Sequence, residues 1–240
     1  MKKALVISIV ALLASVAALV KVYLPCAKKA DTNASVNVEQ VLKDHPEYVV
    51  NALQAYEQKM RDEEEARVQA LVKSNEAALK EGNAPFQGPA DSKIVLVEFF
   101  DYACGYCRRL YPELNEIIAQ NADVKVMYRP LAFVSPYSEY AARAVLAANE
   151  QGKFNELHTA LFTVQKPLDE KLVDELAGKA GIDVEKMKAD MKSEKVNAAF
   201  AANNSLAEKI QINGVPSLIL NGEMLQPAPK AIQEKIDQAK

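Results

Sequence analysis

The sequence has few of the residues that build metal-rich or disulfide-rich proteins. It holds 3 cysteines, 2 histidines and no tryptophan in 240 residues. Three cysteines form at most one disulfide, which excludes a disulfide-dense scaffold. The formal net charge is only −3, and no stripe of arginines with interleaved aromatic residues is present. Because phosphate binding requires a clustered basic surface, nucleic acid is not the expected partner.

The overall composition is that of an ordinary globular protein, and the chain begins with an apolar leader. With 50% hydrophobic and 25% charged residues, the chain can form one good-sized domain and an accessory segment. Lys2 and Lys3 precede an unbroken apolar run from Ala4 to Val20, which is typical of an export signal. Residues 1–30 are therefore expected to be a cleaved signal peptide or an uncleaved membrane anchor, and both place the rest in the periplasm. Cys26 is either an incidental leader cysteine or a lipidation site.

Residues 31–80 show the periodicity of a helical arm. An apolar seam recurs at four-three-four spacing, formed by Val49, Leu53, Tyr56 and Met60. This seam needs an apolar partner, so the arm either self-associates, making the protein a homo-oligomer, or folds back on its own domain. Residues 81–92 gather glycine and proline and are predicted to be a linker.

Residues 93–240 combine strand and helix patterns, which predicts an α/β domain. The run "KIVLVEFFDY" does not alternate with polar residues, so it is expected to be a strand buried on both faces. "CRRLYPELNEIIAQ" and "VKVMYR" add a helix and a second, parallel strand. A helical insertion covers about residues 136–210. "GVPSLILNGEML" then predicts a hairpin with Asn221-Gly222 at its turn, before a last helix at residues 229–239.

Two cysteines lie where the first strand becomes a helix. Cys104 and Cys107 are separated by Gly105 and Tyr106 alone, so their sulfurs come within bonding distance. At the helix start, unpaired N–H groups and the helix dipole favour a thiolate on Cys104, which is the attacking species. Cys107, one turn on and less exposed, would resolve the mixed disulfide. The pattern indicates a redox-active disulfide that needs no other cofactor.

Other interpretations of this pair compete with redox chemistry. A structural zinc site needs four ligands, and the spacing of His45 and His158 does not supply them. A structural disulfide would close only a tiny loop and constrain the unfolded chain little. Inert buried thiols are the third alternative. In an exported protein, a bare pair at a strand–helix junction favours the redox interpretation.

From Val95 to Pro112, and again at "GVPSLILNG", the sequence resembles the DsbA-like branch of the thioredoxin superfamily. The agreement covers about residues 93–240 and includes "FFDYACGYC", a helix with Pro112, a helical insertion and Val215-Pro216 before a strand. The resemblance implies a thioredoxin fold with a helical insertion. It also implies thiol–disulfide exchange with cysteine-containing exported proteins and a membrane redox partner. A helical arm in front of such a domain is similar to the oligomeric ScsC- and Com1-like subgroup, some members of which isomerise disulfides.

The resemblance also implies roles for single residues. Cys104 would be the nucleophile and Cys107 the resolving cysteine. Pro216 matches the family's cis-proline, and Val215 before it would pair with a substrate strand. Glu98 matches an acidic residue that accepts the proton of the second cysteine. A buried carboxylate takes up a proton readily, but the alternative for Glu98 is a carboxylate held by a lysine or by water.

The sequence also suggests expectations for four further residues. Tyr106, between the cysteines, is expected to tune the redox potential. His158 is expected to be a packed helix residue rather than a catalyst. Arg108 and Arg109 are expected to form a solvated face.

Three functions fit these observations. The first is a general extracytoplasmic protein thiol–disulfide oxidoreductase. The second is an oligomeric disulfide isomerase, because the Gly105-Tyr106 dipeptide is similar to that of periplasmic isomerases, whereas Val215 before the proline is similar to the oxidases. The third is not enzymatic: soft thiolates suit Cu(I), which would make the protein a copper-tolerance factor.

Overall fold

The structure, a computed structural model, describes residues 37–82 and 84–240. The predicted leader, residues 1–30, and Cys26 lie outside the described residues. The chain divides into two compact units between Gln58 and Lys59. Within the described part, no helix is both long and apolar enough to cross a membrane.

A five-stranded mixed sheet forms the centre of the second unit, in the order β1-β3-β2-β4-β5. The central strands β2 and β3 run parallel, and all other neighbours are antiparallel. Every residue of β2 is buried, which confirms the prediction made from its lack of alternation. The strands are β1 (Phe86–Gln87), β2 (Ile94–Phe100), β3 (Val124–Pro130), β4 (Ser217–Leu220) and β5 (Glu223–Leu225).

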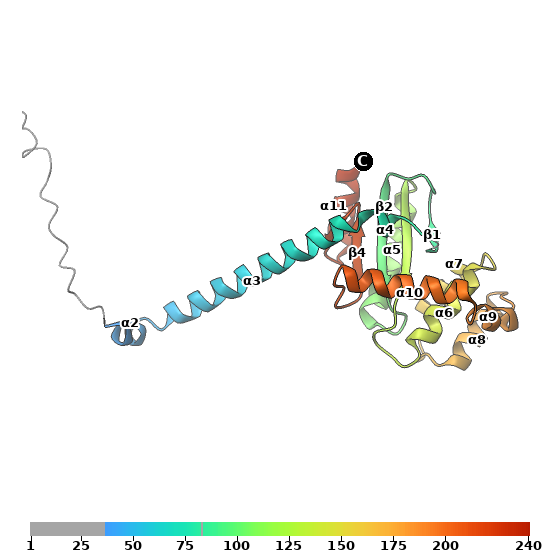
Figure 1. Cartoon of the computed structure of the whole chain (residues 1–240), viewed down its shortest axis with the longest axis horizontal. Coiled ribbons are helices and arrows are strands. Elements are labelled where there is room, and N and C mark those ends of the chain that lie inside the picture. The colour runs from blue at the N-terminus through green and yellow to red at the C-terminus, as the bar shows by residue number, and fades with distance from the viewer. Residues whose placement is uncertain (1–36, 83) are drawn as a thin grey trace, which may run out of the picture. The chain divides into compact units, whose positions relative to one another are not determined.

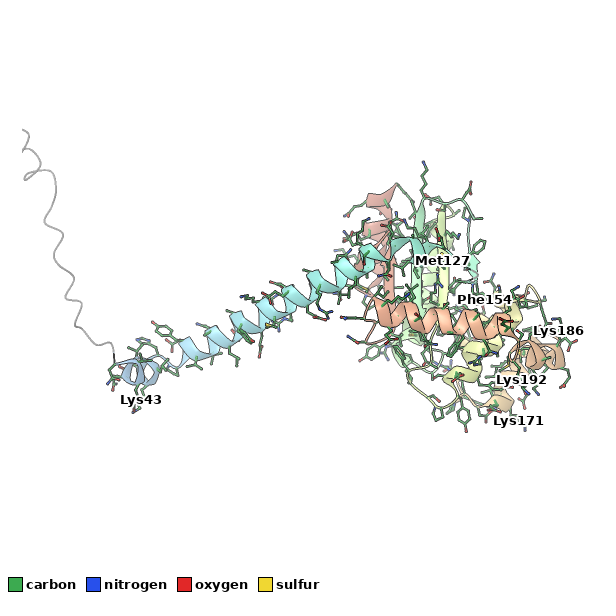
Figure 2. All side chains as sticks on the ribbon, in the orientation of Figure 1. Lys43, Met127, Phe154, Lys171, Lys186 and Lys192 are labelled. Atoms are coloured by element: carbon green, nitrogen blue, oxygen red, sulfur yellow. The ribbon has the colours of Figure 1, made fainter. Side chains whose placement is uncertain are left out.

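Helices cover both faces of the sheet, and α6 to α10 form the predicted helical insertion (Figure 1). Figure 2 places Met127 in the sheet and Lys171, Lys186 and Lys192 on the insertion. The β4–β5 hairpin turns at Asn221 and Gly222, whose φ angles of 48° and 81° suit the predicted two-residue loop. The helices are α5 (Gly105–Gln120), α6 (Ser138–Asn149), α7 (Phe154–Thr163), α8 (Glu170–Lys179), α9 (Val184–Asp190), α10 (Glu194–Lys209) and α11 (Pro229–Ala239).

Two hydrophobic clusters lie on the two faces because side chains alternate along each strand. On β2, Leu96 and Phe100 join the larger cluster with residues of α5, α6, α7 and α11. Val97 and Phe99 join the second cluster, which includes Leu206 of α10. Glu98 has the parity of Leu96 and Phe100, so its side chain is directed to the same face as theirs, which α5 covers.

The C-terminal end of the predicted arm belongs to the second cluster. α3 (Glu47–Ser74) and α4 (Glu76–Lys80) contribute Val72 and Leu79, which are 0% and 1% exposed. The Gln69 side chain donates to the Gly222 carbonyl oxygen at 2.7 Å and accepts from the Met224 N–H at 2.9 Å. This part of the arm therefore packs on its own domain.

The N-terminal part of the arm keeps its apolar side chains exposed. α2 (Val38–Asp44) ends just before Pro46, and α3 begins directly after that proline. The charged run "RDEEEAR", residues 61–67, follows the predicted seam, and α3 continues through it as one helix. The exposed large apolar residues here are Val38, Leu42, Tyr48, Val49, Val50, Leu53, Tyr56 and Met60.

The predicted linker, residues 81–92, contains structure that the sequence did not indicate. β1 pairs with β3, with Phe86 opposite Met127. The Tyr128 hydroxyl donates to the Gln87 Oε1 atom at 2.9 Å. Glycine and proline here shape the entry to an edge strand rather than a free linker, because β3 offers backbone groups that β1 satisfies.

Candidate active site

The turn from Asp101 to Ala103 joins β2 to α5 and places Cys104 at the start of the helix. Cys104 is the N-cap residue, with extended φ and ψ angles of −75° and 120°. Its N–H donates to the Asp101 carbonyl oxygen at 3.0 Å. Cys104 therefore lies at the N-terminal, positive dipole end of α5, as the sequence predicts, although its side chain makes no capping hydrogen bond.

The two sulfurs have different surroundings. Both thiols are free, with Cys104 6% and Cys107 0% exposed. Burial raises the pKa of the Cys107 thiol well above its ordinary value, and the charges of Cys104 and Glu98 raise it further. Cys107 therefore stays protonated until a nearby group accepts its proton.

Cys104 faces the loop before β4. The Cys104 Sγ atom donates to the Val215 carbonyl oxygen at 3.4 Å. The Val215–Pro216 peptide bond is cis, as the resemblance implies. Both residues line a groove of about 590 Å³ beside α5, together with Tyr106, Arg109, Leu110, Glu113, Gly214, Ser217 and Pro227. The structure thus brings Cys104, Tyr106, Val215 and Pro216 together.

Glu98 lies on the buried side of the pair. It is 3% exposed, and in the sheet it stands opposite Tyr128 of β3 and Leu218 of β4. Burial alone raises its pKa to about 8. Its charge in turn contributes to the raised pKa values of Cys107, Tyr102 and Tyr128, although burial is the larger cause in each. Among the described residues no lysine or arginine pairs with Glu98, so the expected alternative of a lysine-held carboxylate is not found.

His158 is enclosed by aromatic rings, which agrees with the expectation of a packed residue. Its Nδ1 atom lies 2.9 Å from the Tyr102 hydroxyl. Burial lowers the pKa of His158 to about 3, so the imidazole is neutral near neutral pH. The surrounding rings belong to Phe100, Tyr102, Tyr111, Tyr128, Phe154 and Phe162.

Asp101 is a site residue to which the sequence analysis gave no role. Its Oδ1 atom accepts from the Ala103 N–H and the Ser138 hydroxyl, both at 2.8 Å. Its Oδ2 atom accepts from the N–H groups of Phe133 at 2.7 Å and Val134 at 2.9 Å. Asp101 thereby joins the active-site turn to the loop between β3 and α6. The available signal was its place directly after a strand buried on both faces, where a carboxylate requires partners.

The expectation of a solvated face is wrong for Arg108 and holds for Arg109. Arg108 Nε donates to the Tyr102 carbonyl oxygen at 2.9 Å, and a second nitrogen donates to the Val164 carbonyl oxygen. These carbonyls have no helical partner, which explains why a half-buried guanidinium is held here. Arg109 is exposed and lies over the Tyr106 ring, 4.4 Å from its centroid.

Within the described residues, no three side chains of His, Cys, Asp or Glu gather in a way that could hold a metal ion. Binding of Cu(I) by the two thiolates alone stays a prediction.

A free cysteine at a helix start, a second buried cysteine one turn on and a facing cis-proline, on this mixed sheet, define a thioredoxin-like thiol–disulfide site. Residues 95–236 match the model of the DSBA-like thioredoxin domain. The chain therefore belongs to the DsbA-like family of the thioredoxin superfamily.

Solved structures support the same assignment. A thioredoxin-like oxidoreductase from Silicibacter pomeroyi is 33% identical, with a TM-score of 0.65 over 68% of this chain and 95% of that one. A linker-deleted mutant of Proteus mirabilis ScsC is 25% identical, with a TM-score of 0.68 over 87% and 98% of the two chains. BcfH from Salmonella enterica Typhimurium, 24% identical over 84% and 92% of the two chains with a TM-score of 0.73, shows the fold.

Curated relatives are longer proteins. A Na(+)/H(+) antiporter NhaA of Salinispora tropica is 28% identical over 138 residues, which are 57% of this chain and 21% of that protein. One of Mycolicibacterium vanbaalenii is 34% identical over 141 residues, 57% of this chain and 23% of that protein. This chain thus spans less than a quarter of their length, and the matched stretch has about the length of one DsbA-like domain.

Proposed function

We propose that the protein is an extracytoplasmic protein thiol–disulfide oxidoreductase. Its Cys104–Cys107 pair would exchange electrons with the cysteines of exported proteins. The observation that carries the proposal is the position of the Cys104 sulfur, at the N-terminus of α5 and 3.4 Å from the Val215 carbonyl oxygen. Two sulfurs carry the two electrons, so the reaction needs no further cofactor.

In the oxidising direction, a substrate thiolate attacks Cys104 Sγ in the Cys104–Cys107 disulfide. The sulfur–sulfur bond breaks, and Cys107 leaves as a thiolate that takes a proton from Glu98. A second substrate thiolate then attacks the mixed disulfide and releases Cys104 as a thiolate. The substrate loses two electrons and the protein gains them, and a membrane redox partner would remove them again. A Glu98 pKa of about 8 suits a group that both donates and accepts this proton near neutral pH.

Substrate would lie in the groove beside α5. Val215, which contacts the Cys104 sulfur, lines this groove and offers backbone groups to an extended segment. Pro216 and Tyr106 form part of its walls.

The catalytic proposal is tested by the reduction of insulin with dithiothreitol. The wild-type protein should accelerate the appearance of insulin aggregates, and Cys104→Ala should remove the acceleration completely. The absence of catalysis by the wild-type protein would overturn the proposal.

A second candidate function is disulfide isomerisation by an oligomer. It is favoured by the exposed apolar residues of α2 and the first half of α3, such as Leu42, Leu53 and Tyr56, which a second copy could cover. Assembly would bring two or more Cys104 sites to one unfolded substrate. The test compares the full chain with a deletion of residues 31–58, which keeps the buried Val72 and Leu79. Light scattering should show the loss of an oligomer, and refolding of scrambled ribonuclease should fall with it.

The location rests on the leader. Lys2, Lys3 and the apolar run Ala4–Val20 support export to the periplasm. Cell fractionation followed by N-terminal sequencing tests both the location and the removal of the leader.

A further inference from the structure

The groove beside Cys104 carries one cation and one anion. Arg109 and Glu113 are exposed residues of α5, and both line the groove. Four positions apart, they share one face of the helix at an axial separation of about 6 Å. Neither side chain forms an ion pair with another described residue. Both charges are therefore available to a bound molecule.

Arg109 is the charge nearer to the reacting sulfur. Its guanidinium lies 4.4 Å from the centroid of the Tyr106 ring. Its Nη1 atom lies 3.9 Å from the position that a Cβ atom on Gly105 would take. Gly105 and Tyr106 directly follow Cys104, whereas Glu113 lies two turns further along α5. The groove thus presents positive charge beside the sulfur and negative charge farther away.

We propose that Arg109 and Glu113 make the groove selective for substrate segments with an acidic side chain close to the reacting cysteine and a basic side chain farther away. The inference rests on the proposed function and names its substrate class. In an extended segment, side chains two residues apart lie on one face and are about 6.6 Å apart. This spacing matches the separation of the two charges for a segment that runs along α5.

The overall charge of the protein predicts the opposite preference. A net charge of −3 repels acidic peptides and attracts basic ones at long range. A measured preference for an acidic neighbour would therefore report the local charge of Arg109.

The test measures how fast Cys104 captures peptides that differ in one charge. The reduced full chain carrying Cys26→Ala and Cys107→Ala, so that Cys104 is its one thiol, is mixed with peptides whose single cysteine is disulfide-bonded to thionitrobenzoate. The residue two positions from that cysteine, which shares its face in an extended segment, is Glu, Gln or Lys. The Cys104 thiolate attacks the peptide sulfur, the disulfide breaks, and coloured thionitrobenzoate leaves as a thiolate.

At low ionic strength the Glu peptide should react about fivefold faster than the Lys peptide, in the range of one exposed ion pair. Arg109→Gln should abolish this ratio, Arg109→Lys should retain most of it, and Glu113→Gln should increase it. Salt should reduce it, because the charges are exposed. Lys192→Gln removes one positive charge from the helical insertion and should leave the ratio unchanged (Figure 2).

Equal rates for the three peptides would overturn the inference and leave the oxidoreductase proposal intact. An equal change of the ratio by Lys192→Gln and by Arg109→Gln would also overturn the inference, since the net charge of the protein would then be responsible for the preference. If no peptide releases thionitrobenzoate, Cys104 is unreactive and the proposed function itself fails.

Discussion

On the open side of the active-site turn, Cys104 is 6% exposed with its Sγ atom against Val215 of the groove, and Tyr106 is 69% exposed. On the closed side, Cys107, Glu98 and His158 are 0%, 3% and 4% exposed. Only two residues separate the cysteines, yet their surroundings differ. At the helix start, backbone dipoles stabilise an anion, whereas burial disfavours every charge on the closed side.

This difference suits thiol–disulfide exchange. The exchange needs one sulfur that is ionised and accessible, and a second that stays protonated until the mixed disulfide has formed. Burial raises the pKa of Cys107 and raises that of Glu98 to about 8, which leaves Glu98 as the nearby group able to move the proton. A helix that begins at the first cysteine produces both environments within one turn.

The largest effect is expected when the closed sulfur is removed. Cys107→Ala should still capture substrate through Cys104 but should not release it, so turnover should be lost. Substrate complexes that are sensitive to reducing agent should accumulate on non-reducing gels. The control removes every thiol, with Cys26→Ala and Cys104→Ala added, and should form none. Normal turnover by Cys107→Ala would show that the two sulfurs do not have separate roles.

A smaller effect is expected when the proton acceptor is removed. Glu98→Gln should slow the attack of Cys107 on a mixed disulfide by about 10²-fold, the usual contribution of general acid–base catalysis. The wild-type rate should rise with pH up to about 8, where Glu98 loses its proton, and this rise should disappear in the variant. Stopped-flow mixing at several pH values measures the rate of this attack in both proteins. Identical pH profiles would assign the proton to another group.

The buried groups Glu98 and His158 should also determine how the stability of the fold depends on pH. Glu98 has a folded pKa of about 8 against an ordinary 4.5, so it binds its proton more tightly when folded, and stability falls as pH rises through this window. His158 has a folded pKa of about 3 against 6.5, so stability falls as pH drops from 6.5 to 3. Each slope is at most about 1.4 kcal/mol per pH unit.

The two slopes have opposite signs and cancel where the two pH windows overlap. The reduced protein should therefore be most stable on a plateau from about pH 4.5 to 6.5. The free energy of unfolding, measured by urea unfolding from about pH 3 to 8, gives the profile. Glu98→Gln should flatten the alkaline side, and His158→Phe should flatten the acid side while keeping an aromatic ring. A wild-type profile that stays level from pH 6.5 to 8 would contradict the raised pKa of Glu98.

Much of this site could be predicted because its signals are local. The non-alternating strand, the cysteine spacing and the Val215-Pro216 pair are each a short contiguous stretch of sequence, and the structure places them as expected. The burial of Glu98 followed from the strand alone, because a strand without alternation is covered on both faces.

The missed features depend on contacts between distant segments. The role of Asp101 depends on Phe133, Val134 and Ser138, which reach it only after the β3 crossover. The burial of Arg108 depends on Val164, 56 positions away. β1 and the end of α3 have weak local signals, since pairing with β3 and packing on the sheet decide their structure.

The smallest effect is expected on the open side. Tyr106→Ala removes an exposed ring that contacts the Arg109 guanidinium, an interaction of about 0.5 kcal/mol at such a site. The free energy of unfolding should therefore change by no more than about 0.5 kcal/mol. KM for protein substrates should rise a few-fold, because the groove loses a wall. Tyr106→Phe keeps the ring and should resemble the wild type. A loss of several kcal/mol in stability would mean that Tyr106 supports the fold, and the division into an open and a closed side would then not describe the turn.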